Sequence, residues 1–259
     1  MAFAGRVGAV KYGMPTILAI ETSSELASVA LSLPTGAVLA RESSGVRTHS
    51  QSVLPMVQEV LAEAGIALAD CTAVAFGAGP GSFTGVRTAC GVAQGLAFGA
   101  NLPVLPLVTL EALAEACRVR TGATEVLAVL DARMGEVYWA QYRYGVDGAW
   151  QAVCAPALCA PQDVAPRFHP GLAACGNGFA AYPQDLAAGL ARAGAGTSLA
   201  VGAHADILPH ARELAVLGAV ALAAGQGVPA DQAQPLYLRN KVAYTSAERQ
   251  VINAAKPGA

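Results

Sequence analysis

The sequence predicts an α/β protein made of two tandem subdomains, because one pattern of strands and acids occurs twice along the chain. The first copy, ILAIETSSELASVAL at 17–31, and the second, LAVLDARMGEVYWAQ at 127–141, each read as a buried strand, an acidic turn and a second strand. Overlaying the copies places Glu21 on Asp131, and each acid follows four apolar residues. With 259 residues the chain is long enough for two such cores. A chance similarity between two hairpins is the alternative explanation.

A third segment fits the duplicated plan. LAACGNGF at 172–179 predicts a short strand ending in Gly-Asn-Gly, where a base could lie against bare backbone, although an ordinary turn also explains it. An acid that ends a first strand, followed by small hydroxyl residues, is how the actin-like ATPase fold (ASKHA, RNase H-like) arranges its phosphate loops. The two acids lack a third metal ligand. The sequence therefore indicates a vestigial nucleotide cleft, formed by Glu21, Thr22, Ser23, Asp131, Gly176 and Gly178.

Two helices are predicted between the hairpins. The first begins near His49 and runs to a cap at Gly65, with an apolar stripe at three- to four-residue spacing. The second follows a glycine-rich loop, and in it Gly91, Gly95 and Gly99 recur every four residues. Since a glycine inside a helix costs about 1 kcal/mol relative to alanine, this repetition predicts that another backbone approaches closely. Periodicity does not separate the helix side that faces the sheet from the side that faces a partner.

The loop GAGPGSFTGVR at 77–87 lies between a predicted strand and a predicted helix, the usual place of a phosphate-binding loop. A P-loop needs a lysine after its last glycine, but Val86 stands there instead. A dinucleotide fingerprint also fails, because serine or threonine occupies the place of the third glycine. Arg87 is then a polar handle suited to a carboxylate or phosphate on another chain. We expect a structural loop that lets the next helix lie tight against the sheet, formed by Gly79, Pro80, Gly81, Ser82 and Gly85.

Composition excludes several classes of function. The chain is 54% hydrophobic and 13% charged, yet no apolar stretch reaches the roughly 20 residues of a membrane span, so we expect no membrane and apolar surfaces that meet a partner. A formal net charge of −2 without a lysine or arginine run predicts weak RNA binding by the isolated chain. The four histidines and six cysteines form no metal motif, and the start lacks a signal peptide. These features predict a cytoplasmic protein with reduced thiols, no metal and no cofactor.

The predicted boundaries divide the chain into four parts. Residues 14–113 form an N-terminal subdomain that carries the two helices. Residues 114–243 form a smaller second subdomain, whose last helix, at about 211–226, can pack back on the first. Residues 1–13 are expected to be a disordered extension, or to precede a true start at Met14. Residues 244–259 form a C-terminal tail, and the segment YLRNKVAYTSAER at 237–249, with Arg239, Lys241 and Arg249, is either solvated or in contact with tRNA or a partner.

A resemblance to a known family rests on five segments in order: ILAIETS, HSQSVLPMVQEVL, GAGPGSFTGVRTACGVAQGLA, DARMGEVYWAQY and PLYLR. Together they resemble the bacterial TsaB (YeaZ) family of tRNA threonylcarbamoyladenosine biosynthesis, over roughly 16–242. The glycine-rich block is the most specific part, while 151–170 matches loosely. The chain departs from the family pattern in its extension before Met14 and at Glu21, where many relatives have aspartate.

The resemblance implies two actin-like subdomains and a non-catalytic role beside the catalytic paralogue TsaD. TsaD transfers a threonylcarbamoyl group to N6 of adenosine 37 in tRNA (t6A37), and the ATPase TsaE joins the complex. Family members also form homodimers through the same two N-terminal helices, and tRNA is a partner only within the complex. The partner-binding residues expected on this basis are Val53, Val57, Val60, Leu61, Arg87, Ala89, Val92, Ala93 and Leu96.

Two other functions stay open at this point. An ATP-dependent small-molecule kinase would use Glu21 and Asp131 around magnesium, and it predicts tight binding of a magnesium nucleotide. A metallopeptidase, suggested only by an older naming of the catalytic relatives, needs metal ligands that the sequence does not supply. The catalytic paralogue carries a pair of metal-binding histidines, whereas only His49 stands in the corresponding region here.

Overall fold

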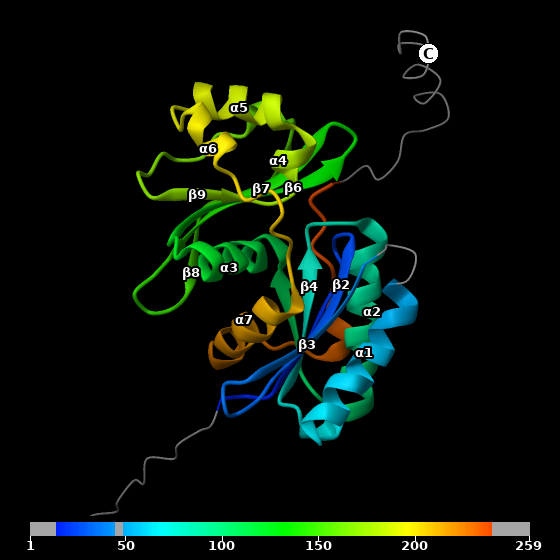
Figure 1. Ribbon diagram of the computed structural model, residues 1–259. Coiled ribbons are helices and arrows are strands. Elements are labelled where there is room, and N and C mark those ends of the chain that lie inside the picture. Colours follow the sequence, from blue (N-terminus) through cyan, green and yellow to red (C-terminus); the bar gives the residue numbers. More distant parts are fainter. Residues whose placement is uncertain (1–13, 45–48, 240–259) are drawn as a thin grey trace, which may run out of the picture.

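The computed structural model describes residues 14–44 and 49–239, which form two lobes, each built on its own β-sheet (Figure 1). The strands of the first sheet are β1 (Ile17–Glu21), β2 (Leu26–Ser32), β3 (Val38–Ser44), β4 (Ala73–Gly79) and β5 (Val104–Val108). Their order is β3-β2-β1-β4-β5. β1, β2 and β3 pair antiparallel, whereas β4 pairs parallel with both β1 and β5.

The second sheet repeats this plan. Its strands are β6 (Glu125–Arg133), β7 (Glu136–Tyr144), β8 (Trp150–Cys159) and β9 (Leu172–Cys175). The order β8-β7-β6-β9 matches β3-β2-β1-β4, and the antiparallel and parallel pairings match as well. The duplicated α/β architecture predicted from the two strand–acid–strand copies is therefore confirmed.

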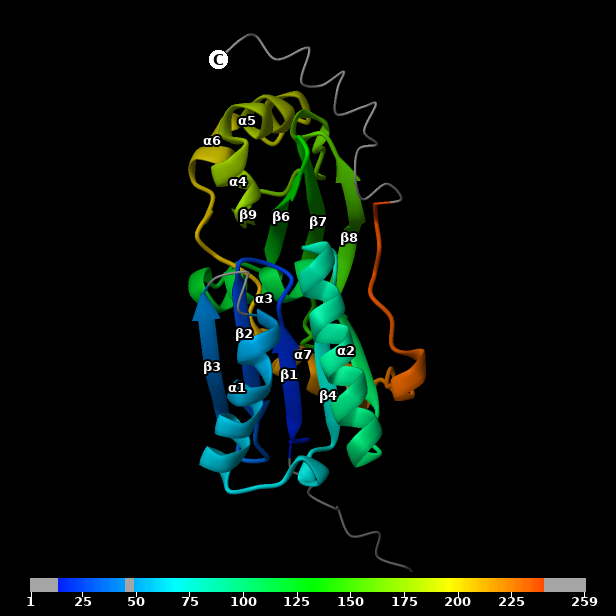
Figure 2. The same ribbon diagram turned by 90° about the vertical axis from the view of Figure 1, so that its right-hand side faces the viewer.

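Helices cover both faces of the first sheet, so β1 is buried along its whole length (Figures 1 and 2). α1 (His49–Ala64) and α2 (Phe83–Ala100) lie on one face, and α7 (Ala211–Ala223) lies on the other. α1 ends at Gly65, whose φ of +67° is the left-handed conformation typical of a glycine cap. The predicted helix that ends at this cap is confirmed.

The second sheet is covered in the same way. α3 (Thr109–Thr121) packs on one face. The short helices α4 (Gly178–Ala181), α5 (Pro183–Arg192) and α6 (Thr197–Val201) lie at the other face. Among the described residues, 3-10 helices occur at η2 (Leu68–Asp70), η3 (Pro161–Asp163) and η4 (Ala230–Gln232).

The boundary between the lobes lies slightly earlier in the chain than predicted. A division after residue 113 would cut α3, which packs on the second sheet through most of its buried residues and places Ala112 in the core beneath α7. The first crossing between lobes is at Val108–Thr109, where β5 ends and α3 begins. α7 returns to the first lobe and packs on its sheet. The parts predicted for 1–13 and 244–259 lie outside the described residues.

After η4 the chain forms a strap, residues 233–239, which passes α2 and reaches the second lobe (Figure 2). Ala233 is buried in the core beneath α2, and Leu238 packs against the core of the second lobe. The strap therefore joins the two cores directly, beside the crossing at Val108–Thr109, because the end of β4 contacts both segments.

Two expectations from the composition concern the surface and the thiols. In the part of the chain that the structure describes, no helix has both the length and the hydropathy to cross a membrane. The six cysteines stand as free thiols in the structure. Four of them are buried, namely Cys71, Cys90, Cys117 and Cys175.

Candidate functional site

The glycine-rich loop lies directly on the turn of the first hairpin. A Cβ atom at Gly85 would overlap the carbonyl oxygen of Thr22, and one at Gly77 would overlap the carboxyl group of Glu21. A Cβ atom at Gly81 would lie 2.6 Å from the Cβ of Ser23. Glycine is thus required at these three positions because the hairpin turn occupies the space that side chains would need.

Hydrogen bonds fix this contact. The Ser82 N–H donates to the Ser23 carbonyl at 2.7 Å, and the Thr22 hydroxyl donates to the Gly85 carbonyl at 2.7 Å. Ser82 also caps α2, since its Oγ accepts from the Gly85 N–H at 3.4 Å. The Gly79 N–H donates to the Thr109 hydroxyl at 3.1 Å. These amides, which a phosphate would require, are bonded to protein groups.

Glu21 is sealed beneath this contact. Its side chain is fully buried, and its Oε1 accepts from the Ser23 N–H at 2.5 Å. No described residue hydrogen bonds to its Oε2. Burial raises the pKa of Glu21, an effect that the hydrogen bonds from Ser23 and Thr22 and the charge of His210 oppose. Glu21 is therefore a buried structural acid that a ligand cannot reach.

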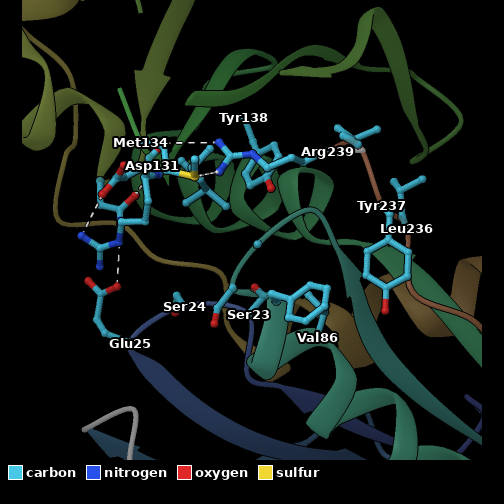
Figure 3. Close-up of a pocket in the computed structure, with 18 residues that line it drawn as sticks. Ser23, Ser24, Glu25, Val86, Asp131, Met134, Tyr138, Leu236, Tyr237 and Arg239 are labelled. Atoms are coloured by element: carbon cyan, nitrogen blue, oxygen red, sulfur yellow. Dashed lines mark hydrogen bonds and ion pairs between the residues drawn. The ribbon is translucent and has the colours of Figure 1, made fainter. Parts of the chain in front are cut away.

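A cavity of about 380 Å³ lies between the lobes, beside this covered turn (Figure 3). Its walls come from the end of the first hairpin turn, the start of α2 with the loop before it, the second hairpin turn, Asn177 and the strap. Figure 3 shows Ser23 and Ser24 on one side and Asp131 and Met134 on the other, with Arg239 reaching across from the strap. The cavity is thus bounded by five segments that are far apart in the sequence.

Only part of the predicted nucleotide cleft lines this cavity. Ser23 and Asp131 do, but Glu21 and Thr22 are buried behind the glycine-rich loop. A Cβ atom at Gly176 would overlap the carbonyl oxygen of Val129, and one at Gly178 would lie 2.6 Å from its Cγ1, so both glycines serve packing against β6. The prediction is corrected for four of its six residues: Glu21, Thr22, Gly176 and Gly178.

The remaining acid of the pair is held by protein groups. The Asp131 Oδ1 accepts from the Tyr182 hydroxyl at 3.1 Å and from the Arg133 N–H at 2.7 Å, and its Oδ2 pairs with the Arg133 guanidinium at 3.0 Å. Glu21 does not share its cavity. Among residues 14–44 and 49–239, no group of three or more histidines, cysteines and acids could hold a metal ion. These residues do not fit a magnesium nucleotide, and the two-acid site of a kinase is not formed.

Asn177 and the strap join the two lobes beside the cavity, although neither was among the predicted site residues. The Asn177 Oδ1 accepts from the Asp131 N–H at 2.9 Å, and its Nδ2 donates to Glu25 across the lobes at 3.4 Å. Arg239 donates to Glu136 at 2.6 Å and so pins the strap to the second hairpin. The glycines flanking Asn177 were predicted as cleft residues instead, and the strap contains PLYLR, which marked the family resemblance but not a site.

Five of the nine expected partner-binding residues face the sheet. Their exposed fractions do not exceed 3%, and all belong to the core beneath α1 and α2: Val53, Val57, Val60, Ala89 and Ala93. The prediction is wrong for these five, because the apolar stripe of each helix is the side that the first lobe itself covers. Leu61, Val92 and Leu96 are half-buried at the rim of that core, and Arg87 is exposed.

The outer face of α2 carries the glycines that recur every four residues. Gly91, Gly95 and Gly99 are exposed, and a Cβ atom at any of them would meet nothing within 4 Å. Phe98 beside them is 82% exposed, and Leu54 of α1 is 47% exposed. The close approach predicted from these glycines is therefore not made by any described residue of this chain.

Arg87 stands at the N-terminal end of this face. Its guanidinium lies 3.3 Å from the centre of the Phe83 ring, and its Nε–H donates to the Tyr237 hydroxyl at 2.8 Å. The Phe83 and Tyr237 rings are 6.1 Å apart. Both rings also line the cavity, so the outer face of α2 and the cavity meet here.

Comparison with known proteins gives one consistent result. The family model described as "TsaD: tRNA N6-adenosine threonylcarbamoyltransferase" matches residues 30–247. The tRNA threonylcarbamoyladenosine biosynthesis protein TsaB of Escherichia coli (strain K12) is 41% identical over 88% of this chain and 96% of its own length. The TsaB protein of Haemophilus influenzae is 38% identical over 88% of this chain and 95% of its own.

Solved structures agree with the sequence relatives. YeaZ from Pseudomonas aeruginosa superposes with a TM-score of 0.75 at 40% identity, covering 87% of this chain and all of its own. A second structure, of a Pseudomonas aeruginosa protein with similarity to peptidase YEAZ, gives a TM-score of 0.76 at 41% identity, over 87% of this chain and all of its own. Together with the two repeated sheets, these matches confirm the predicted actin-like (ASKHA) fold.

Proposed function

The chain belongs to the TsaB (YeaZ) family, and we propose on this basis that it is a non-catalytic, activating and dimerising subunit of a t6A37 transferase complex. The names of its relatives state a role in tRNA threonylcarbamoyladenosine biosynthesis. In the proposed complex the chain binds the catalytic subunit TsaD and helps to recruit the ATPase TsaE. It meets tRNA only within the complex and works in the cytoplasm.

The observation that carries the proposal is the outer face of α2. Three exposed glycines, each costing about 1 kcal/mol relative to alanine in a helix interior, have no packing role among the described residues. Helices pack with axes 8–10 Å apart, and the distance is shortest where the contact residues are small. A line of glycines beside an exposed Phe98 therefore suits a partner helix that lies close along α2.

The rest of the surface supports a binding role over a catalytic one. The turn of the first hairpin is covered by the glycine-rich loop, and Glu21 and Asp131 lie in separate surroundings. Of the expected partner residues, Leu61, Arg87, Val92 and Leu96 remain available at the surface. These residues and the α2 glycines form the proposed contact surface for TsaD, and the homodimer is proposed to use it as well.

Substitution of Gly95 tests the proposal. Gly95→Leu places a side chain in open space on this chain, so it is expected to stabilise the isolated protein by up to about 1 kcal/mol. The same side chain blocks close approach of a second helix, so co-elution with TsaD of the same organism and homodimer formation are both expected to be lost. A urea unfolding curve measures the gain in stability, and size-exclusion chromatography measures the loss of pairing.

The matched control is Ala188→Leu, an exposed position of α5 on the far lobe. It should leave pairing unchanged. Reconstituted tRNA modification, with and without the chain, then measures activation. The proposal is wrong if Gly95→Leu pairs with TsaD as the wild type does, or if modification proceeds equally well without this chain. Charged variants at Val57 or Ala93 would not serve, because they would disrupt the core.

A further inference from the structure

The strap holds Tyr237 in a fixed place beside α2. On its N-terminal side, the Ala233 carbonyl accepts from the Gln94 side chain of α2 at 2.9 Å, and the Leu236 N–H donates to the Ala78 carbonyl at 2.7 Å. On its C-terminal side, Arg239 is bound to the second hairpin. Figure 3 shows Tyr237 and Arg239 leaving the strap in different directions.

The held Tyr237 in turn orients Arg87. The Tyr237 hydroxyl accepts from the Arg87 Nε–H at 2.8 Å, and the Phe83 ring lies 3.3 Å beneath the guanidinium. Cation–π contacts of this kind are worth about 0.5–1 kcal/mol at exposed sites. A guanidinium fixed from two sides loses less side-chain entropy when it binds than a free arginine would.

The far edge of this guanidinium is left open. Among the described residues, the Nη1 and Nη2 groups of Arg87 make no hydrogen bond, and no carboxylate pairs with Arg87. Two coplanar nitrogen donors match the two oxygens of a carboxylate. The nearby cations are already neutralised, since Arg133 pairs with Asp131 and Arg239 with Glu136.

We propose that Phe83, Arg87 and Tyr237 form a preorganised clamp for an aspartate or glutamate carboxylate of the partner subunit. This inference rests on the proposed function, and it adds Phe83 and Tyr237 as positioning residues for Arg87. The clamp lies on the first turns of α2, continuous with the glycine face of the same helix. A protein carboxylate fits better than an RNA phosphate backbone, because backbone binding draws on several unpaired cations and the clamp offers one.

The test measures the affinity of the full-length chain for TsaD of the same organism at low and at high salt. Arg87→Gln is expected to weaken binding about tenfold to a hundredfold at low salt and to flatten the salt dependence. Tyr237→Phe keeps the ring but loses the hydroxyl, so a loss of about threefold to tenfold is expected. Arg192→Gln, on an exposed arginine of α5, is the matched control and should bind as the wild type does.

Each outcome bears on the clamp separately from the proposed function. If the wild-type chain does not bind TsaD at any salt concentration, the proposed function fails. If the wild type binds but Arg87→Gln binds equally well, the clamp is wrong while the proposed function stands. If the affinity of the wild-type chain for TsaD does not depend on salt, the clamp is wrong. This measurement needs no variant, so it tests the clamp even if Arg87→Gln fails to fold. If Arg87→Gln binds TsaD as the wild type does but the assembled complex binds tRNA more weakly, Arg87 contacts phosphate. The clamp is then also wrong.

Discussion

The turns of the two hairpins occupy equivalent places in a repeated plan, yet one is covered and the other is open. In the first lobe the chain after β4 lies on Thr22 and Ser23, and Glu21 is buried. In the second lobe the chain after β9 packs against Val129, two residues before Asp131, and Asp131 lines the cavity. The hairpin motif therefore does not decide whether its turn can receive a ligand. The position of the glycines in the next connection decides it.

The largest expected effect comes from closing the space at Gly85. Gly85→Ala would push a methyl group into the Thr22 carbonyl, and neither backbone segment can yield without moving α2. We expect a loss of about 3 kcal/mol in the free energy of unfolding, measured by urea denaturation. Gly95→Ala is the matched control in the same helix, and it should gain about 1 kcal/mol because its surroundings are open. Equal stability of the two variants would contradict the covered turn.

A smaller effect concerns the buried acid of the covered turn. The pKa of Glu21 is raised in the folded protein, so its contribution to stability is complete below the unfolded value near 4.5 and decreases as the pH rises above it. Glutamine does not titrate. The stability of Glu21→Gln relative to the wild type should therefore improve as the pH rises above about 4.5. Chemical denaturation at several pH values measures this trend. If the free energies of unfolding of the two proteins change with pH in parallel, Glu21 is not buried as described.

The smallest effect is expected from nucleotide. Because the Ser82 amide is bonded to Ser23 and the Asp131 carboxylate to Arg133 and Tyr182, neither hairpin turn offers a phosphate site. Isothermal titration of the isolated chain with magnesium ATP should give no binding heat up to about 1 mM. An actin-like sugar kinase titrated alongside provides the positive control. Binding of magnesium ATP with a micromolar Kd would reopen the kinase hypothesis. It would also contradict the conclusion that neither hairpin turn offers a phosphate site.

Much of the architecture could be predicted from the sequence, because it depends on local patterns. The repeated strand–acid–strand segments gave both hairpins, and the stripes and the cap at Gly65 gave α1 and α2. The same stripes misled the assignment of partner residues. An apolar stripe marks the side that is buried, and here the first lobe's own sheet buries Val57 and Ala93.

The site was harder to predict, because contacts between distant segments determine it. Glu21 and Asp131 have similar neighbours in sequence, and only the packing of Gly77 against Glu21 separates them. Arg87 and Tyr237 are 150 positions apart, and a lone tyrosine before the C-terminal tail has no periodicity to mark it. The glycines of the loop signalled a close approach correctly, but the sequence could not name the segment that approaches.

The covered turn also limits how this lobe can change over generations. Replacing Glu21 by aspartate would leave the Thr22 carbonyl against Gly85 and the Ser82 amide bonded to Ser23. Freeing the turn requires the loop, the helix cap and α2 to shift together, and no single codon change achieves that. Such a lobe is thus committed to its present architecture.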